Sequence, residues 1–181
     1  MSRLATLSTL GAVLALCSVA QARIANFQCT FPNDLQQVNH TWVFDEQNVE
    51  LSLAEVIEAV GSDPLLLSGD TDGDQTLHVV KAVENQTGVT WTGYELHLSG
   101  AGVSFVAPVG SSHFLTWNVT ANLIEYFSPN PVPHGDTVVL DFYINVQESG
   151  LFSFTLTQAP IPEPATLGLL ALGGLLLRRR G

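Results

Sequence analysis

The chain has 181 residues, of which 17 are acidic and 6 are basic, and its formal net charge is -11. This length allows one ordinary domain with short extensions and excludes two full-sized domains. Apolar residues make up 46% of the chain, which excludes a protein that is disordered by composition. The acidic balance excludes non-specific binding to nucleic acid, because an acidic surface repels phosphate groups.

The N-terminal segment 1–22 has the pattern of a secretory signal peptide. Arg3 supplies a positive charge, and residues 4–19 are apolar or small and carry no charge. Ala20 and Ala22 form the small-x-small pattern that signal peptidase accepts, so we expect cleavage after Ala22. The segment therefore predicts export through the secretion machinery, and the alternative is an uncleaved membrane anchor.

The C-terminal segment 161–181 is predicted to enter the cytoplasmic membrane. Residues 165–177 are apolar. As a transmembrane helix they would span about 20 Å, which is short against a hydrocarbon core of about 30 Å. Three arginines follow the helix and are expected to stay in the cytoplasm, namely Arg178, Arg179 and Arg180. Together with the signal peptide, this topology places the residues between the two segments outside the cytoplasmic membrane.

A Pro-Glu-Pro sequence, formed by Pro162, Glu163 and Pro164, comes directly before this helix. Its prolines favour an extended segment at the membrane face. The Pro-Glu-Pro sequence, the short apolar helix and the terminal arginine cluster, in this order, resemble the PEP-CTERM protein-sorting domain. This tail is also known as an ice-binding-protein C-terminal domain. The alternative is a plain tail anchor.

The resemblance implies a Gram-negative bacterium and an exosortase, the membrane enzyme that processes such tails when surface proteins are exported. It implies that the protein is anchored in the inner membrane before processing and afterwards lies at the cell surface or is secreted. Exopolysaccharide production often accompanies such proteins, so exopolysaccharide is an implied partner. The implied sorting signal comprises Pro162, Glu163, Pro164, Arg178, Arg179 and Arg180.

Residues 23–160 form the predicted exported domain, which has 16 acidic residues but only two basic ones, Arg23 and Lys81. Such a domain could attract cations and should stay soluble. Cys29 is its one cysteine, so no disulfide can form within the domain. We expect Cys29 to be buried among apolar neighbours, and the alternative is a disulfide between two chains.

Alternation of apolar and polar residues, typical of strands with one buried face, recurs along this domain. It predicts strands at 38–45, 77–85, 91–99, 113–127, 137–146 and 151–157. Turn-forming residues separate them at 85–88, 99–102, 128–133 and 148–150. Residues 51–60 fit either a short helix or a strand. The pattern predicts an all-β fold, namely an antiparallel β-sandwich of immunoglobulin-like or jelly-roll-like type.

Asp70, Asp72 and Asp74 place three carboxylates at alternate positions, a spacing that can surround calcium in a loop. The rest of the loop fits calcium poorly, because Gln75 stands where a glycine is needed and Lys81 where an acid is needed. Asp and Gly also favour turns through their backbone conformation. We therefore expect a polar turn and assign no metal ligand, and calcium binding stays the alternative.

The sequence carries no recognised pattern of a catalytic or cofactor site. Five histidines lack the spacing of a zinc site and are expected at the surface: His40, His78, His97, His113 and His134. Acids from distant parts of the chain could still pair to form a hydrolase site. We predict a non-catalytic protein without a cofactor, and a secreted hydrolase is the weaker alternative.

The three tryptophans bear on a further alternative. Alternation places Trp117 in the core, while the positions of Trp42 and Trp91 are less determined. A tryptophan exposed on a β-sandwich can stack on a sugar ring. The leading prediction is an exported cell-surface or extracellular-matrix protein, and the alternative is a module that binds carbohydrate or exopolysaccharide.

Overall fold

The computed structural model describes residues 23–32, 39–147 and 150–164, and this part of the chain is all-β, as predicted. Its eleven strands are β1 (Ile24–Thr30), β2 (Asn39–Asp45), β3 (Glu50–Ile57), β4 (Asp63–Thr71), β5 (Gln75–Asn85), β6 (Trp91–Ser99), β7 (Val103–Ser111), β8 (Thr116–Val119), β9 (Leu123–Val132), β10 (Thr137–Val146) and β11 (Gly150–Pro162). The predicted signal peptide and the helix at 165–177 lie outside the described residues. Within the described ranges, no helix has the length and apolar character needed to cross a bilayer.

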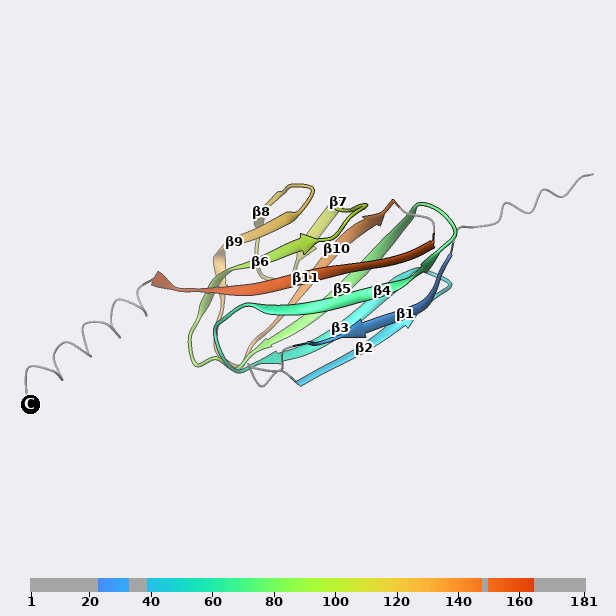
Figure 1. Cartoon of the computed structure of the whole chain (residues 1–181). Coiled ribbons are helices and arrows are strands. Elements are labelled where there is room, and N and C mark those ends of the chain that lie inside the picture. The colour runs from blue at the N-terminus through green and yellow to red at the C-terminus, as the bar shows by residue number, and fades with distance from the viewer. Residues whose placement is uncertain (1–22, 33–38, 148–149, 165–181) are drawn as a thin grey trace, which may run out of the picture.

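The strands form two sheets that pack face to face (Figure 1). One sheet has six strands in the order β1-β4-β11-β6-β9-β8, and the other has five in the order β2-β3-β5-β10-β7. Alternate apolar residues from both sheets form one buried core, which includes Leu65 and Leu67 of β4 and Leu51 and Leu53 of β3. Removing these side chains from water is the main force that holds the two sheets together.

One strand pair departs from the predicted antiparallel arrangement. β3 and β5 are parallel neighbours, with Glu50 opposite His78 and Ile57 opposite Asn85, whereas the other described pairs are antiparallel. The five-stranded sheet is therefore mixed. The reason is the connection between these two strands: β4 lies in the other sheet, so the chain runs back along that sheet and returns in its original direction.

Strands with clear alternation lie close to where the sequence predicts them. β2, β5, β6 and β10 match predicted strands, and residues 51–60 contribute to strand β3 instead of a helix. β11 extends five residues beyond the predicted strand end, to Pro162. The alternation does not predict β1, β4 and β7.

The region from residue 113 to residue 133 differs most from the prediction. The single strand expected at 113–127 is divided into β8 and β9. The turn expected at 128–133 lies mostly within β9, where the residues between Phe127 and Val132 bulge away from β6. Pro129 and Pro131 explain the bulge, because proline has no N–H to donate to a neighbouring strand.

The described chain starts and ends at opposite ends of the sandwich. β1 and β11 both run antiparallel to β4, and Ile24 and Gly150 both lie opposite Thr71. β11 therefore starts at the same end of the sandwich as β1, on the other side of β4, and runs to the far end (Figure 1). We name the end that holds Arg23 the N-terminal end, and the end that holds Pro164 the tail end.

Candidate functional site

The Pro-Glu-Pro segment continues directly from β11 at the tail end. β11 pairs with β6 as far as Pro162, which lies opposite Trp91. The next residue, Glu163, donates its backbone N–H to the Thr90 carbonyl oxygen over 2.9 Å. Pro162 is half-buried, whereas Glu163 and Pro164 are exposed. The backbone of the folded domain therefore holds the segment in place and leaves the Glu163 carboxylate open to solvent.

Ile161 packs the end of β11 tightly against β6. A Cβ added at Gly93 would lie 3.1 Å from Ile161 Cδ1 and 2.6 Å from the Tyr126 carbonyl oxygen, so only glycine permits this approach. The domain boundary predicted between residues 160 and 161 consequently falls inside β11, because the strand continues to Pro162. The other predicted sorting and cleavage residues lie outside the described residues: Ala20, Ala22, Arg178, Arg179 and Arg180.

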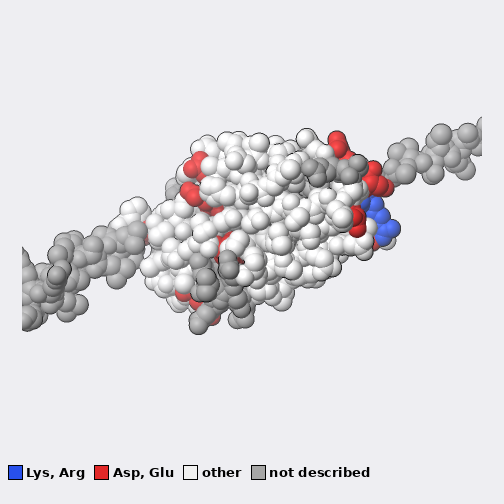
Figure 2. Space-filling view, in the orientation of Figure 1, with Lys and Arg blue, Asp and Glu red and all other residues white. Residues whose placement is uncertain are grey.

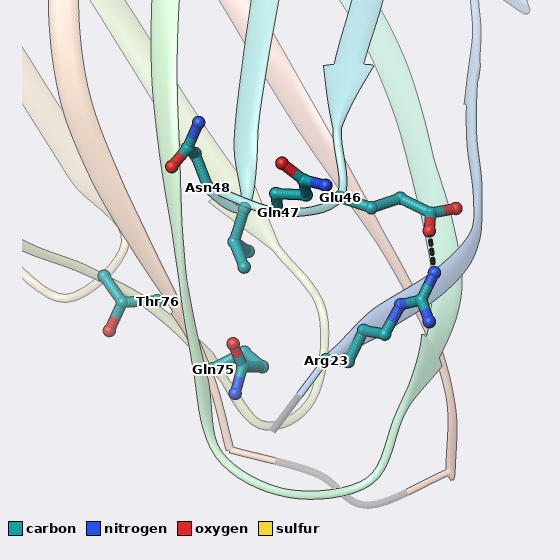
Figure 3. Close-up of a pocket in the computed structure, with 7 residues that line it drawn as sticks. Arg23, Glu46, Gln47, Asn48, Gln75 and Thr76 are labelled. Carbon is teal, nitrogen blue, oxygen red and sulfur yellow. Dashed lines mark hydrogen bonds and ion pairs between the residues drawn. The ribbon is translucent and has the colours of Figure 1, made fainter. Parts of the chain in front are cut away.

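An open groove of about 730 Å³ lies at the N-terminal end (Figure 3). The β2–β3 turn, the start of β5 and the first described residue line it: Arg23, Glu46, Gln47, Asn48, Val49, Gln75 and Thr76. The guanidinium of Arg23 forms an ion pair with the Glu46 carboxylate (Figure 3). Both side chains are largely exposed, so the pair contributes little to stability. The groove is polar and open to solvent.

The three aspartates singled out by their spacing lie at this same end: Asp70 is in the last part of β4, and Asp72 and Asp74 are in the turn that leads to β5. The Arg23 backbone N–H donates to Asp72 Oδ1 over 2.8 Å, and the Asn26 amide donates to Asp70 Oδ2 over 2.9 Å. Asp74 precedes β5 and is exposed. In the part of the chain that the structure describes, no three His, Cys, Asp or Glu side chains are grouped to hold a metal ion.

Lys81 does not lie beside this turn. It is fully buried on β5 and forms an ion pair with Glu55, so its charge is no argument against calcium in the turn. Since Lys81 does not reach the surface, Arg23 is the only basic residue on the described surface. Figure 2 shows one blue patch, at one end of the molecule, next to acidic side chains. On the described surface, acidic side chains therefore far outnumber this one basic residue.

Two histidines, His78 and His97, make hydrogen bonds to acidic side chains of adjacent strands or of their own strand. His78 Nδ1 lies 3.1 Å from Glu50 Oε2, and His78 Nε2 lies 2.9 Å from Asp141 Oδ1. These contacts connect the neighbouring strands β3, β5 and β10. His97 is exposed, as predicted, with its Nε2 3.2 Å from Glu95 Oε2. His78 therefore links three strands, whereas His97 contacts an acid of its own strand, β6.

Two of the tryptophans contribute to the core. Trp91 is fully buried, and its indole N–H donates to Thr87 Oγ1 over 3.0 Å. Trp42 is half-buried and meets Phe27 of the opposite sheet edge-on, with ring centroids 6.1 Å apart. Trp91 therefore fills the core position that the sequence left undetermined.

Trp117 was expected in the core, and this prediction is wrong. Its side chain is 40% exposed on β8, and Leu115 and Val119, two positions away along the chain, are exposed as well. Trp117 lies opposite the buried Tyr126, so it is on the face of the sheet that carries the core. β8 is the outermost of six strands, however, and the facing sheet has only five, so its inner face is incompletely covered.

The core also contains polar residues, which the alternation of apolar residues does not predict. The buried polar residues are Glu55, Asp63, Thr71, Lys81, Asn85 and Gln158. A signal for them exists, because Lys81 is in phase with the buried Val79 and Val83 along β5. Gln158 likewise continues the buried alternation of Phe152, Phe154 and Leu156. A charged residue in phase with a buried face predicts a partner inside the core.

Cys29 is buried, as expected, and is a free thiol. Burial raises the pKa of this thiol to about 12, and the nearby charge of Lys81 opposes the shift. Because the thiolate is the reactive form, Cys29 is chemically inert at neutral pH in the folded protein.

Comparison with known proteins assigns the tail but not the domain. Residues 160–180 match the family model of the PEP-CTERM protein-sorting motif. No curated protein matches the chain. The match includes the exposed Glu163 and Pro164 at the tail end, where β11 leaves the sandwich. The chain therefore carries a PEP-CTERM protein-sorting motif, which implies an exported protein that is sorted at the membrane by an exosortase.

Proposed function

We propose that this protein is a non-catalytic component of the cell surface or extracellular matrix, delivered there by exosortase processing of its tail. The observation that carries the proposal is the position of the motif. Glu163 and Pro164 are exposed directly after the last strand, and the backbone of Glu163 is held by Thr90. A membrane enzyme can therefore reach the motif while the domain stays folded.

The arrangement of the two ends supports this proposal. A tail that enters the membrane after Pro164 keeps the tail end toward the membrane and the N-terminal end away from it. The groove and the aspartate turn then face outward. Cleavage after Ala22 would leave the new α-amino group on Arg23, whose backbone nitrogen is 2.8 Å from Asp72 Oδ1. The mature terminus would thus gain an ion pair.

Cell fractionation tests the leading proposal. In the native host, the protein is expected in the surface or matrix fraction with a mass below that of the signal-cleaved precursor. In a strain without the exosortase, it is expected in the membrane fraction with its tail attached. An exported protein without such a tail serves as the control for fractionation. Equal mass and equal location in both strains would contradict the proposal.

Binding of exopolysaccharide is the second candidate, and the exposure of Trp117 favours it. Trp117 lies on the outermost strand of its sheet, and Leu115 and Val119, two positions away along the chain, are also exposed. An aromatic face with apolar neighbours can stack on a sugar ring. The surface is acidic and would repel an anionic polysaccharide, so a neutral polysaccharide fits it better.

Co-sedimentation with the host's purified exopolysaccharide tests this candidate. If Trp117 is the stacking residue, Trp117→Ala should weaken binding about tenfold, which corresponds to one stacking contact. Val43→Ala is the matched control, because Val43 is also an exposed apolar residue on a strand, at 68% exposure, but lies in the other sheet. Equal binding by the wild type and both variants would remove Trp117 as a sugar-binding residue.

A further inference from the structure

A lysine and a glutamate are in contact inside the core. Lys81 Nζ forms an ion pair with Glu55 Oε1, and both side chains have 0% exposure. The two residues come from the parallel neighbours β3 and β5, where Leu53 lies opposite Lys81 and Glu55 lies opposite Val83. Both side chains point inward, since all four positions are buried. The register therefore brings one amine and one carboxyl group together on the core side of the sheet.

This buried pair is poorly suited to remain charged. An ammonium group has three donors, yet within the described residues Lys81 Nζ has no hydrogen-bond partner beyond its ion pair with Glu55. Burying charges with so few partners is unfavourable. Burial lowers the pKa of the Lys81 amine, and Glu55 offsets this effect only in part. The neutral amine, which is the nucleophilic form, is therefore more accessible to Lys81 than to a lysine in water.

Gln158 of the opposite sheet holds the carboxyl group in position. Its Nε2 donates to Glu55 Oε2 over 2.6 Å, and its Oε1 accepts the hydroxyl of Tyr94 over 2.5 Å. Gln158 also hydrogen-bonds Asp63, whose pKa is raised by burial and by the charge of Glu55. The donor on Oε2 is placed where negative charge would develop if a nucleophile attacked the carboxyl carbon.

We propose that Lys81 and Glu55 condense into an intramolecular amide bond that joins β3 to β5. Proton transfer within the ion pair first gives the amine and the carboxylic acid. The Nζ lone pair attacks Glu55 Cδ and forms the C–N bond, while Gln158 Nε2 stabilises the charge on Oε2. A proton passes from nitrogen to Oε1, the Cδ–Oε1 bond breaks, and Oε1 leaves as water. The products are one amide and one water molecule, without any oxidant or cofactor.

The composition of the exported domain explains why such a bond would be useful to it. Lys81 is the only lysine of the chain, and Cys29 is the only cysteine outside the predicted signal peptide, so the exported domain cannot form an internal disulfide. A covalent link between two residues distant in sequence restricts the unfolded chain, as a disulfide does. An amide link between β3 and β5 would therefore protect the sandwich outside the cell, and it would resist reduction.

Proteolysis of the purified full-length protein, fully denatured before digestion, tests the bond. Trypsin cannot cleave after a lysine whose amine is acylated, so the wild type should yield no free peptide spanning residues 24–81. That segment should remain joined to the following one, with a total mass lighter by one water. A glutamate-specific protease should likewise fail to cut after Glu55, and fragmentation should show a branched peptide that connects Glu55 and Lys81.

Two variants complete the experiment. Glu55→Met leaves Lys81 without an acyl partner, so trypsin should cleave after Lys81 even if the variant does not fold. Glu58→Gln removes an exposed acid three residues further along and should keep the bond. Wild-type protein that is cleaved after Lys81 as completely as Glu55→Met, with no mass deficit, would overturn the proposal. Because the wild-type result alone decides, misfolding of a variant does not affect the conclusion.

Discussion

Changing Glu163 and Pro164 together to alanine is expected to keep the unprocessed protein in the cytoplasmic membrane. Both side chains are exposed, so an exosortase can read them, and neither fills the core. The Glu163 backbone N–H that bonds Thr90 is retained in alanine. The free energy of unfolding should therefore change by about 0.5 kcal/mol or less, as for other surface substitutions. Pro162 is left unchanged because it lies opposite Trp91 in the sheet.

Mature mass and cell fractionation in the native host measure this effect, and urea unfolding of the purified protein measures stability. Glu58→Ala is the matched control, because Glu58 is an exposed acid outside the motif that follows β3 toward the tail end. The control should be processed like the wild type. Normal processing of the double variant would show that these two side chains are not part of the recognised signal.

Trp91→Ala is expected to lower the free energy of unfolding by about 3–5 kcal/mol. The indole of Trp91 is fully buried, and its removal leaves a large cavity and removes one of the hydrogen bonds of the Thr87 hydroxyl, which keeps its bond to Asn85. Trp117→Ala should cost much less, because the Trp117 side chain is 40% exposed and little cavity forms. Urea unfolding followed by circular dichroism measures both changes.

The two variants serve as controls for each other, because Trp91→Ala and Trp117→Ala remove the same atoms. If Trp117→Ala were as destabilising as Trp91→Ala, β8 would have to be covered in solution by another part of the protein or by a second chain. The slope of the unfolding curve should stay the same in both variants, because the unfolded chain exposes nearly the same surface.

Local patterns in the sequence were sufficient for two kinds of prediction. The alternation of apolar and polar residues located β2, β5, β6 and β10, because a strand with one buried face repeats every two residues. The Pro-Glu-Pro motif was recognised from neighbouring residues alone, and the family match at 160–180 confirms it. Both features depend on residues that are close together in the chain.

Three strands could not be predicted in this way, and their sequences explain why. β1 contains a bulge between Ala25 and Gln28, with Asn26 at a positive φ of 52°, which disturbs its period of two. β4 includes the apolar run from Leu65 to Leu67 and then Gly69, and β7 contains Pro108. Each of these strands is held by pairing with a neighbour distant in sequence, which a local pattern does not contain.

Alternation correctly assigned Trp117 to the same face of its sheet as the core, since it lies opposite the buried Tyr126. Only the tertiary structure decided that Trp117 stays exposed, because a sheet of six strands extends beyond a facing sheet of five. The same holds for Lys81, whose phase along β5 could be read from the sequence. Its partner Glu55 could not, because the parallel pairing of β3 and β5 arises only when β4 crosses to the other sheet.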